Sequence, residues 1–184
     1  AIHLAKLGHN IKIWSFDEEE KRIITGKITG IEDEYYKIKN EKIPCAIVWY
    51  EDIKVLIPIS HLGISKQTKS MLRGMLGSEI DFIVMEIDET TNLAIASRID
   101  AMNLRAKLEL PKLKLNDNIK VRVIAVGIKH IIVEMYGKEV IIKAENLQHT
   151  YIVNCKDIYT PGDYLKVKIK TLDIENNIFE LDAK

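Results

Sequence analysis

Short stretches in which apolar and polar residues alternate recur along the whole chain. They cover 23–31, 46–50, 54–59, 80–87, 119–126, 131–135, 139–142 and 165–172. A period of two places every second side chain on one face of a β-strand. The chain also holds 31 isoleucines and 10 valines, and β-branched residues favour strands. Short strands separated by polar or glycine-containing segments predict a barrel or a sandwich rather than βαβ units.

The apolar pattern repeats at a constant offset of 85 residues, which indicates a duplication. The first copy of this pattern is Val48, Val55, Ile57, Leu62, Gly77 and Asp88. Its second copy is Val133, Val140, Ile142, Leu147, Gly162 and Asp173. Repeats of this length predict that one supersecondary unit occurs twice. We therefore expect two five-stranded units, of which the first carries an extra charged segment at 32–44 in its opening hairpin.

The segment between the two units has the pattern of a short helix. Ile99, Met102 and Ala106 recur at helical spacing, and Pro111 ends the pattern. We expect this helix to pack against both units, because glycine and serine are too sparse for a flexible linker. The predicted divisions are an N-terminal helical or extended segment at 1–22, a first unit at 23–96, the connecting helix at 97–113 and a second unit at 114–184.

Composition narrows the class of protein without deciding its function. Hydrophobic residues make up 47% and charged residues 29%, which is typical of a globular protein. Lys+Arg and Asp+Glu are 27 each, so the net charge is zero. No apolar run reaches transmembrane length and no signal peptide is visible, which favours a cytoplasmic location. The first residue is Ala, so the chain is expected to be a fragment trimmed at its N-terminus.

The chain shows no motif of an enzyme or of a metal site. A P-loop, a nucleophile elbow, a zinc-protease motif and a dinucleotide-binding turn are all absent from the sequence. Cys45 and Cys155 lie far apart, and the five histidines share no ligand spacing. We therefore expect a protein that is not an enzyme and that needs no cofactor.

Several segments resemble a known family of RNA-binding domains. They are GKITGI (26–31), VWYEDIKVLIPISHL (48–62) and MLGSEIDFIVMEIDETTNLAIASR (75–98), and in the second half VEMYGKEVIIKAENL (133–147) and TPGDYLKVKIKTLDIENNIFELDAK (160–184). Their order and lengths are similar to those of the S-one domain, which is repeated in the largest small-subunit ribosomal protein. The resemblance implies a mainly β fold of two tandem five-stranded oligonucleotide-binding (OB) barrels. It also implies binding of single-stranded RNA through aromatic, histidine and basic residues.

The residues that stack bases in that family are largely replaced in this chain. The family's second-strand Phe falls on Ile47 and Ile132, and its third-strand His falls on Pro58 and Lys143. The turn aspartate is kept in both units, and we expect Asp88 and Asp173 to shape the turn before the last hairpin. The closing basic residue is kept as Arg98 and Lys184.

Other residues offer a rebuilt nucleic-acid surface. Trp49 should point outward if Val48 points inward, either as a stacking platform or packed against the connecting helix or Trp14. Lys66, Lys69 and Arg73 share one helical face, which is either a phosphate-binding patch or an ordinary solvated face. The candidate nucleic-acid-binding residues are Lys27, Tyr36, Trp49, Lys66, Lys69, Arg73, Arg98, Lys129, Lys143 and Lys184.

Two functions remain open from the sequence. The first is binding of single-stranded RNA by the two barrels. The second is a protein–protein adaptor within a larger assembly, because exposed isoleucines at Ile47 and Ile132 would suit an apolar contact. Zero net charge and the lost stacking residues count against the first, because phosphate binding relies on lysine and arginine.

Overall fold

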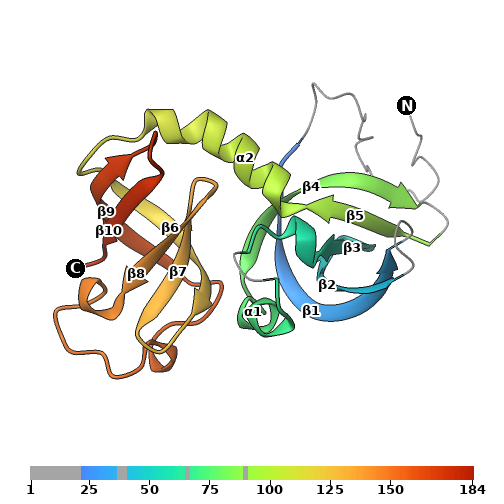
Figure 1. Ribbon diagram of the computed structural model, residues 1–184, viewed down its shortest axis with the longest axis horizontal. Coiled ribbons are helices and arrows are strands. Elements are labelled where there is room, and N and C mark those ends of the chain that lie inside the picture. Colours follow the sequence, from blue (N-terminus) through green and yellow to red (C-terminus); the bar gives the residue numbers. More distant parts are fainter. Residues whose placement is uncertain (1–21, 37–40, 65–66, 89–90) are drawn as a thin grey trace.

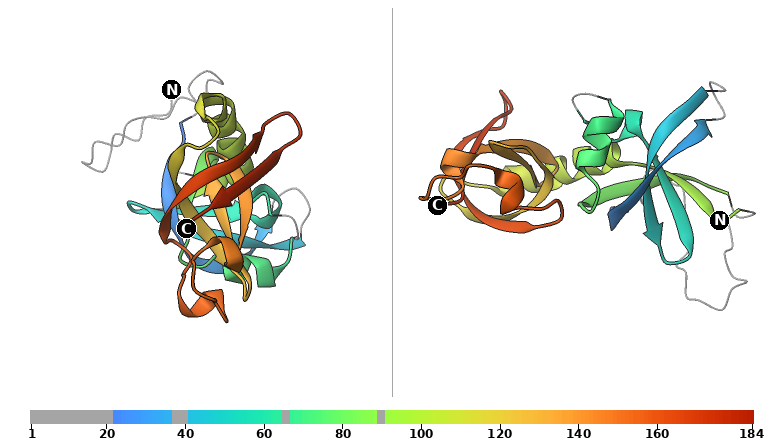
Figure 2. Two further views of the ribbon diagram at one scale, coloured as in Figure 1. Left: turned by 90° about the vertical axis from the view of Figure 1, so that its left-hand side faces the viewer. Right: turned by 90° about the horizontal axis from the view of Figure 1, so that it is seen from below.

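The computed structural model describes residues 22–36, 41–64, 67–88 and 91–184. It consists of two β-rich units that lie side by side, and the helix α2 (Arg98–Glu109) runs across one side of both (Figure 1). The views of Figure 2 show the same two bodies from the end and from below. The helical segment expected at 1–22 lies, apart from Arg22, outside the described residues.

The first unit is a closed barrel. Its strands are β1 (Ile24–Tyr36), β2 (Glu41–Tyr50), β3 (Ile53–Pro58), β4 (Glu79–Asp88) and β5 (Leu93–Ser97), with η2 (Ile59–His61) and α1 (Lys69–Gly74) between β3 and β4. They follow the order β1-β2-β3-β5-β4 around the barrel. β3 and β5 pair in parallel, whereas the other neighbours are antiparallel. The five strands expected for this unit are therefore present.

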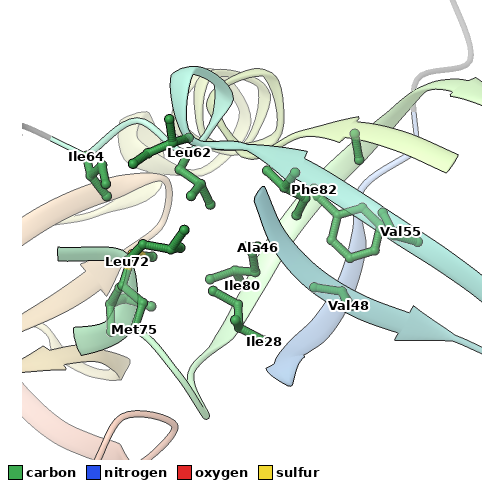
Figure 3. Packing of buried hydrophobic residues seen from close by; sticks show 14 of the residues in the cluster. Ile28, Ala46, Val48, Val55, Leu62, Ile64, Leu72, Met75, Ile80 and Phe82 are labelled. Carbon is green, nitrogen blue, oxygen red and sulfur yellow. The ribbon is translucent and has the colours of Figure 1, made fainter. Parts of the chain in front are cut away.

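Alternating side chains of these strands fill the barrel. Ile28, Val48, Ile57 and Phe82 are almost completely buried. Leu72 of α1 belongs to the same cluster (Figure 3). Burying a side chain of this size stabilises the fold by about 1.5–3 kcal/mol. The period of two in the sequence therefore places the core correctly.

The prediction that Ile47 is exposed is wrong. Ile47 points away from the barrel core, as the alternation requires, but only 3% of its surface is accessible. It packs with Cys45, Leu56 and Leu93 in a second, smaller cluster on the outer side of the sheet. Ile132 in the second unit is half-buried. Neither residue is the open apolar contact that the adaptor hypothesis needs.

The second unit is a five-stranded sheet. Its strands are β6 (Asn118–Val126), β7 (His130–Met135), β8 (Lys138–Lys143), β9 (Tyr164–Asp173) and β10 (Ile178–Asp182), with η4 (Ala144–Asn146) and η5 (Cys155–Asp157) between β8 and β9. The sheet order is β10-β9-β6-β7-β8, and all neighbours are antiparallel. No ladder of hydrogen bonds joins β8 to β10, so the second barrel expected from the sequence is not closed by strand pairing.

The duplicated turns of the two units contact each other. Gly77 precedes β4 and Gly162 precedes β9, and the two are equivalent at the offset of 85 residues. A Cβ atom on Gly162 would lie 2.6 Å from the carbonyl oxygen of Gly77, and Gly162 has a φ of +99°. Glycine is therefore required at 162 both by the close approach and by the backbone conformation. Two residues further on, the Tyr164 hydroxyl donates to the carboxylate of Glu79, again an equivalent pair.

The connecting helix contacts both units. α2 begins at the Ser97 N-cap, whose hydroxyl accepts from the Asp100 amide, and it ends before η3 (Leu110–Lys112), which contains Pro111. α2 packs against β4 of the first barrel. On its other side, the β7–β8 turn lies so close that a Cβ atom on Gly137 would meet the Met102 carbonyl oxygen at 2.1 Å.

A buried network of six charged side chains joins the two units and α2. Arg98 at the start of α2 is fully buried and contacts Glu134 of β7 at 2.7 Å and Glu139 of β8 at 2.8 Å. Arg122 of β6 bridges Glu134 and, across the interface, Asp81 of β4, each at 2.7 Å.

The network continues from Asp81 back to the helix. Arg105 of α2 lies 2.8 Å from the Asp81 carboxylate as a further ion pair. Thr25 of β1 donates a hydrogen bond of 2.6 Å to the same carboxylate. Three arginines therefore meet three carboxylates, so the cluster is electrically balanced. Ile124 of β6 lies beside it and packs into the core cluster of the first barrel.

Asp81 joins β4 of the first barrel both to β6 of the second unit and to α2. Burial alone would raise the pKa of Asp81, but the hydrogen bonds and charge of Arg122, the hydroxyl of Thr25 and the charge of Arg105 outweigh it. The pKa of Asp81 is therefore held below its ordinary value. The two carboxylate oxygens of Asp81 raise the pKa of Arg122 in turn, against its burial.

We predict that Asp81→Asn destabilises the protein by about 3–5 kcal/mol, because it leaves Arg122 and Arg105 without their shared counter-charge. Urea unfolding followed by circular dichroism measures this loss. Glu32→Gln is the matched control, because it breaks an exposed ion pair with Lys54 and should cost less than about 1 kcal/mol. Equal effects of the two substitutions would show that the buried network does not hold the units together.

The same carboxylate predicts a dependence of stability on acid. Because the pKa of Asp81 is lower in the folded than in the unfolded state, its contribution is fully present above about pH 4. It is lost as the pH falls through the lowered value in the folded state. Urea unfolding between about pH 7 and pH 3 should therefore show a smaller acid-induced loss in Asp81→Asn than in the unaltered protein.

Candidate nucleic-acid interface

Several candidate residues of the first barrel do not form a free basic surface. Lys69 is ion-paired with Asp33 of β1 at 2.5 Å, so part of its charge is already neutralised. Arg73 is exposed on the same short helix. Lys66 lies outside the described residues, as does the side chain of Tyr36, which is the last residue of β1.

Trp49 and Lys27 occupy separate places on the first barrel. Trp49 lies next to the end of β2 and is 56% exposed, so the outward orientation expected from the alternation is confirmed. Lys27 of β1 is exposed and lies beside Gly77, at the contact between the two units.

The prediction that Arg98 contacts nucleic acid is wrong. Its side chain has no accessible surface, and it donates to the Leu62 carbonyl oxygen as well as to Glu134 and Glu139. A guanidinium group that is enclosed by two carboxylates and a carbonyl is unavailable to a phosphate. The closing basic residue of the first barrel therefore has a structural role.

The candidates of the second unit, in contrast, come together around one cleft. Lys129, Lys143 and Lys184 line a cleft of about 700 Å³ at the end of the sheet that lies away from α2. They come from the β6–β7 turn, the end of β8 and the C-terminal residue, and all three are exposed. Among the described residues, Glu145 lies 3.8 Å from the Lys143 ammonium, and the Asp182 carboxylate accepts a hydrogen bond of 3.0 Å from the Lys184 amide.

An exposed tyrosine stands over this cleft. Tyr151 is 84% exposed, and the Lys129 ammonium lies 4.8 Å from the centre of its ring. Lys129 also donates a hydrogen bond of 3.0 Å to the Tyr151 hydroxyl. An exposed aromatic ring next to lysine side chains is the combination that stacks a base and holds its phosphate. His130 and His149 line the same cleft.

Backbone hydrogen bonds fix the walls of the cleft. The Ala144 amide donates to the Lys129 carbonyl oxygen at 2.9 Å, which joins the end of β8 to the β6–β7 turn. The Cys155 amide donates to Ile128 at 2.8 Å, and the Ala183 amide donates to Asn146 at 2.8 Å. These bonds tie four separate segments together, so the cleft is formed before a ligand arrives.

The residues that sequence analysis missed lie in the connection between β8 and β9. Gln148, His149, Thr150 and Tyr151 follow the last apolar position of the repeat, Leu147, and carry no motif. Tyr151, an aromatic residue directly after the polar residues 148–150, is the one sequence signal that could have found them. This signal is weak in the sequence because the lysines that lie near Tyr151 in the structure come from distant positions, such as 129 and 143.

The turn role expected for Asp173 agrees with its contacts. Its carboxylate accepts hydrogen bonds from the Asn176 side chain at 2.7 Å and the Asn176 amide at 2.9 Å. These two bonds lower the pKa of Asp173, and they close the turn between β9 and β10. Within the described ranges, no group of three or more His, Cys, Asp or Glu side chains could hold a metal ion. No helix in the same ranges is long and apolar enough to cross a membrane.

Comparison with known proteins gives structural likeness only. No protein-family model matches the chain, and no curated protein matches its sequence. A multidomain protein with nucleic-acid-binding domains from Streptococcus pneumoniae TIGR4 is similar over 89% of this chain and 51% of that one, with 12% identity and a TM-score of 0.41. A chain in an a/eIF2alpha–aDim2p–rRNA complex from Pyrococcus horikoshii OT3 is similar over 39% of this chain and 45% of that one, with 16% identity and a TM-score of 0.37. The chain thus covers about half of each.

We predict that Gly127→Ala changes the cleft without unfolding the protein. A Cβ atom at position 127 would lie 2.7 Å from the His130 ring, so the ring must move. The side-chain NMR signals of His130 should shift, whereas those of His61 in the first barrel should not. Unchanged His130 signals would show that its ring does not rest on Gly127.

Proposed function

We propose that this chain binds single-stranded RNA, and that the cleft of the second unit is its principal contact site. The observation that carries the proposal is the convergence of Lys129, Lys143 and Lys184 on one preformed cleft beside the exposed ring of Tyr151. Binding, rather than catalysis, is the activity that we assign to this site. No cofactor takes part in it.

The chemistry of the cleft favours a single strand over a duplex. Tyr151 can stack only on a base whose face is free, and bases in a duplex are covered on both faces. The three lysines offer point charges for phosphates, and Gln148 and Thr150 offer hydrogen-bond partners for base edges. A cleft of about 700 Å³ has room for an unstacked nucleotide and its phosphate.

The adaptor hypothesis has less support. It depended on an apolar surface at Ile47 and Ile132, but Ile47 is buried and Ile132 is half-buried. The zero net charge of the chain is also a weaker argument against RNA binding than it was from the sequence alone. Ion pairs such as Lys69–Asp33 neutralise cations of the first barrel, whereas the cleft holds three lysines against one carboxylate.

We predict that the protein binds a labelled single-stranded RNA with an affinity that falls steeply with salt. Replacing Lys129, Lys143 and Lys184 by Gln should lower the slope of log K against log[salt] by about 2, since each phosphate contact on a single strand contributes about 0.7. At about 0.1 M salt, this corresponds to a loss of affinity on the order of 100-fold. Fluorescence anisotropy at about 0.05 and 0.2 M salt measures both quantities.

The matched control replaces Lys42 and Lys54 of the first barrel and the exposed Lys107 of α2 by Gln, which changes the net charge by the same amount. Tyr151→Ala should weaken binding by about 1–3 kcal/mol without changing the salt slope, because it removes stacking and no charge. Failure of the unaltered protein to bind RNA at the lower salt concentration would overturn the proposal. Equal losses in the cleft and control variants would show that only net charge matters.

A further inference from the structure

A second basic surface lies on a different face of the second unit, outside the cleft. β6 and β9 are antiparallel neighbours, and their register places Lys120 directly opposite Lys166. Lys168 follows two residues later on the same face of β9, opposite Asn118. Lys120 and Lys166 are exposed and Lys168 is half-buried, whereas Val121 and Val167 on the other face are in the core. We call Lys120, Lys166 and Lys168 the lysine face.

The lysine face is not neutralised by the protein itself. Among the described residues, no carboxylate forms an ion pair with any of its three lysines. Asp182 of β10 lies opposite Lys168 in the register, but its ion pair is with the neighbouring Lys170, at 3.4 Å. Like charges directly opposite each other in a sheet are destabilising. Lys120 lies over Tyr164, whose ring centre is 4.3 Å from the ammonium. The fold therefore gains nothing evident from this arrangement.

The duplication supplies an internal comparison for the same positions. At the offset of 85 residues, Lys166 corresponds to Asp81 and Lys168 to Ile83 of β4. Asp81 and Ile83 are buried against the rest of the interface, with exposed fractions of 0% and 4%. These positions of β4 are thus buried within the protein. The equivalent positions of β9 face the solvent and carry lysines. The fold does not require lysine at 166 and 168, because the equivalent strand β4 forms with other residues at these positions.

A tyrosine and two further arginines border the lysine face. Tyr164, opposite Arg122 and two register positions from the Lys120–Lys166 pair, is 44% exposed. A recess of about 230 Å³ there is lined by Lys120, Tyr164 and Arg105 among others. Burial and the hydrogen bond to Glu79 raise the pKa of Tyr164, so its hydroxyl stays protonated and neutral near neutral pH. Arg105 and Arg122 are ion-paired with Asp81. The positive charge that remains available on this surface is therefore that of the lysine face.

We propose that the lysine face is a second phosphate-contacting surface, on which the backbone of a bound nucleic-acid strand is held after it leaves the cleft. This inference rests on the proposed function, since it extends the same ligand to a second face. Lys120 and Val126, where β6 reaches the cleft turn, are six residues apart, or about 20 Å. At about 3.4 Å per stacked nucleotide, a stacked strand that reaches both surfaces spans about six nucleotides.

The test uses the whole chain and a labelled oligouridylate of about 16 nucleotides, the upper end of the length that one OB-type unit binds. Lys120, Lys166 and Lys168 are replaced together by Gln. We expect the salt slope of binding to fall by about 2, and the affinity at about 0.1 M salt to fall on the order of 100-fold. The control variant again replaces Lys42, Lys54 and Lys107 by Gln, with the same change in net charge.

Thermal unfolding accompanies the titration. The lysine-face variant should be at least as stable as the unaltered protein, because the substitution relieves the repulsion between Lys120 and Lys166. A variant that binds the 16-mer with the same slope as the control overturns the lysine face while leaving the cleft intact. If the unaltered protein does not bind the 16-mer, the proposed function itself fails. Loss of the slope in the lysine-face variant alone supports the inference.

Discussion

The buried pairing of Arg98, Arg105 and Arg122 with Asp81, Glu134 and Glu139 is the constraint on which the arrangement of the two units depends. A buried charge is tolerated only when its partner is in place, so a small displacement of one unit would leave several charges unpaired. Apolar contacts such as that of Ile124 fix the relative position of the two units less strictly, because apolar surfaces can shift against each other without leaving a charge unpaired. The network therefore selects one arrangement among those that apolar packing alone would allow. The positions of the cleft and of the lysine face relative to the first barrel follow from it.

The neutral net charge of the chain conceals a separation of charge in space. In the first barrel, lysines such as Lys54 and Lys69 pair with acids of the opposing hairpin. In the second unit, the lysines of the cleft and of the β6–β9 face have few acidic neighbours. Electrostatic attraction for a polyanion depends on the local field rather than on the sum over the chain. The net charge of the chain therefore does not describe the local field around the second unit.

The strands and the first core could be predicted because they depend on local pattern. Alternation places Val48 inside and Trp49 outside, and both positions are correct. The same rule fails for Ile47, because it gives the direction of a side chain and not whether another cluster covers it. Arg98 was misassigned for a related reason. Its partners Glu134 and Glu139 lie 36 and 41 residues further along the chain, and no spacing rule connects them.

The contact between the turn at Gly77 and the turn at Gly162, and between Glu79 and Tyr164, has the character of an isologous interface. In such an interface, as in a dimer with two-fold symmetry, residues at the axis meet their own equivalents. Two identical chains must place every substitution on both sides of their axis. A tandem chain is free of that restriction, so position 81 can hold an acid while its equivalent, 166, holds a base. Covalent linkage thus allows one half to specialise in assembly and leaves the other half open to the solvent.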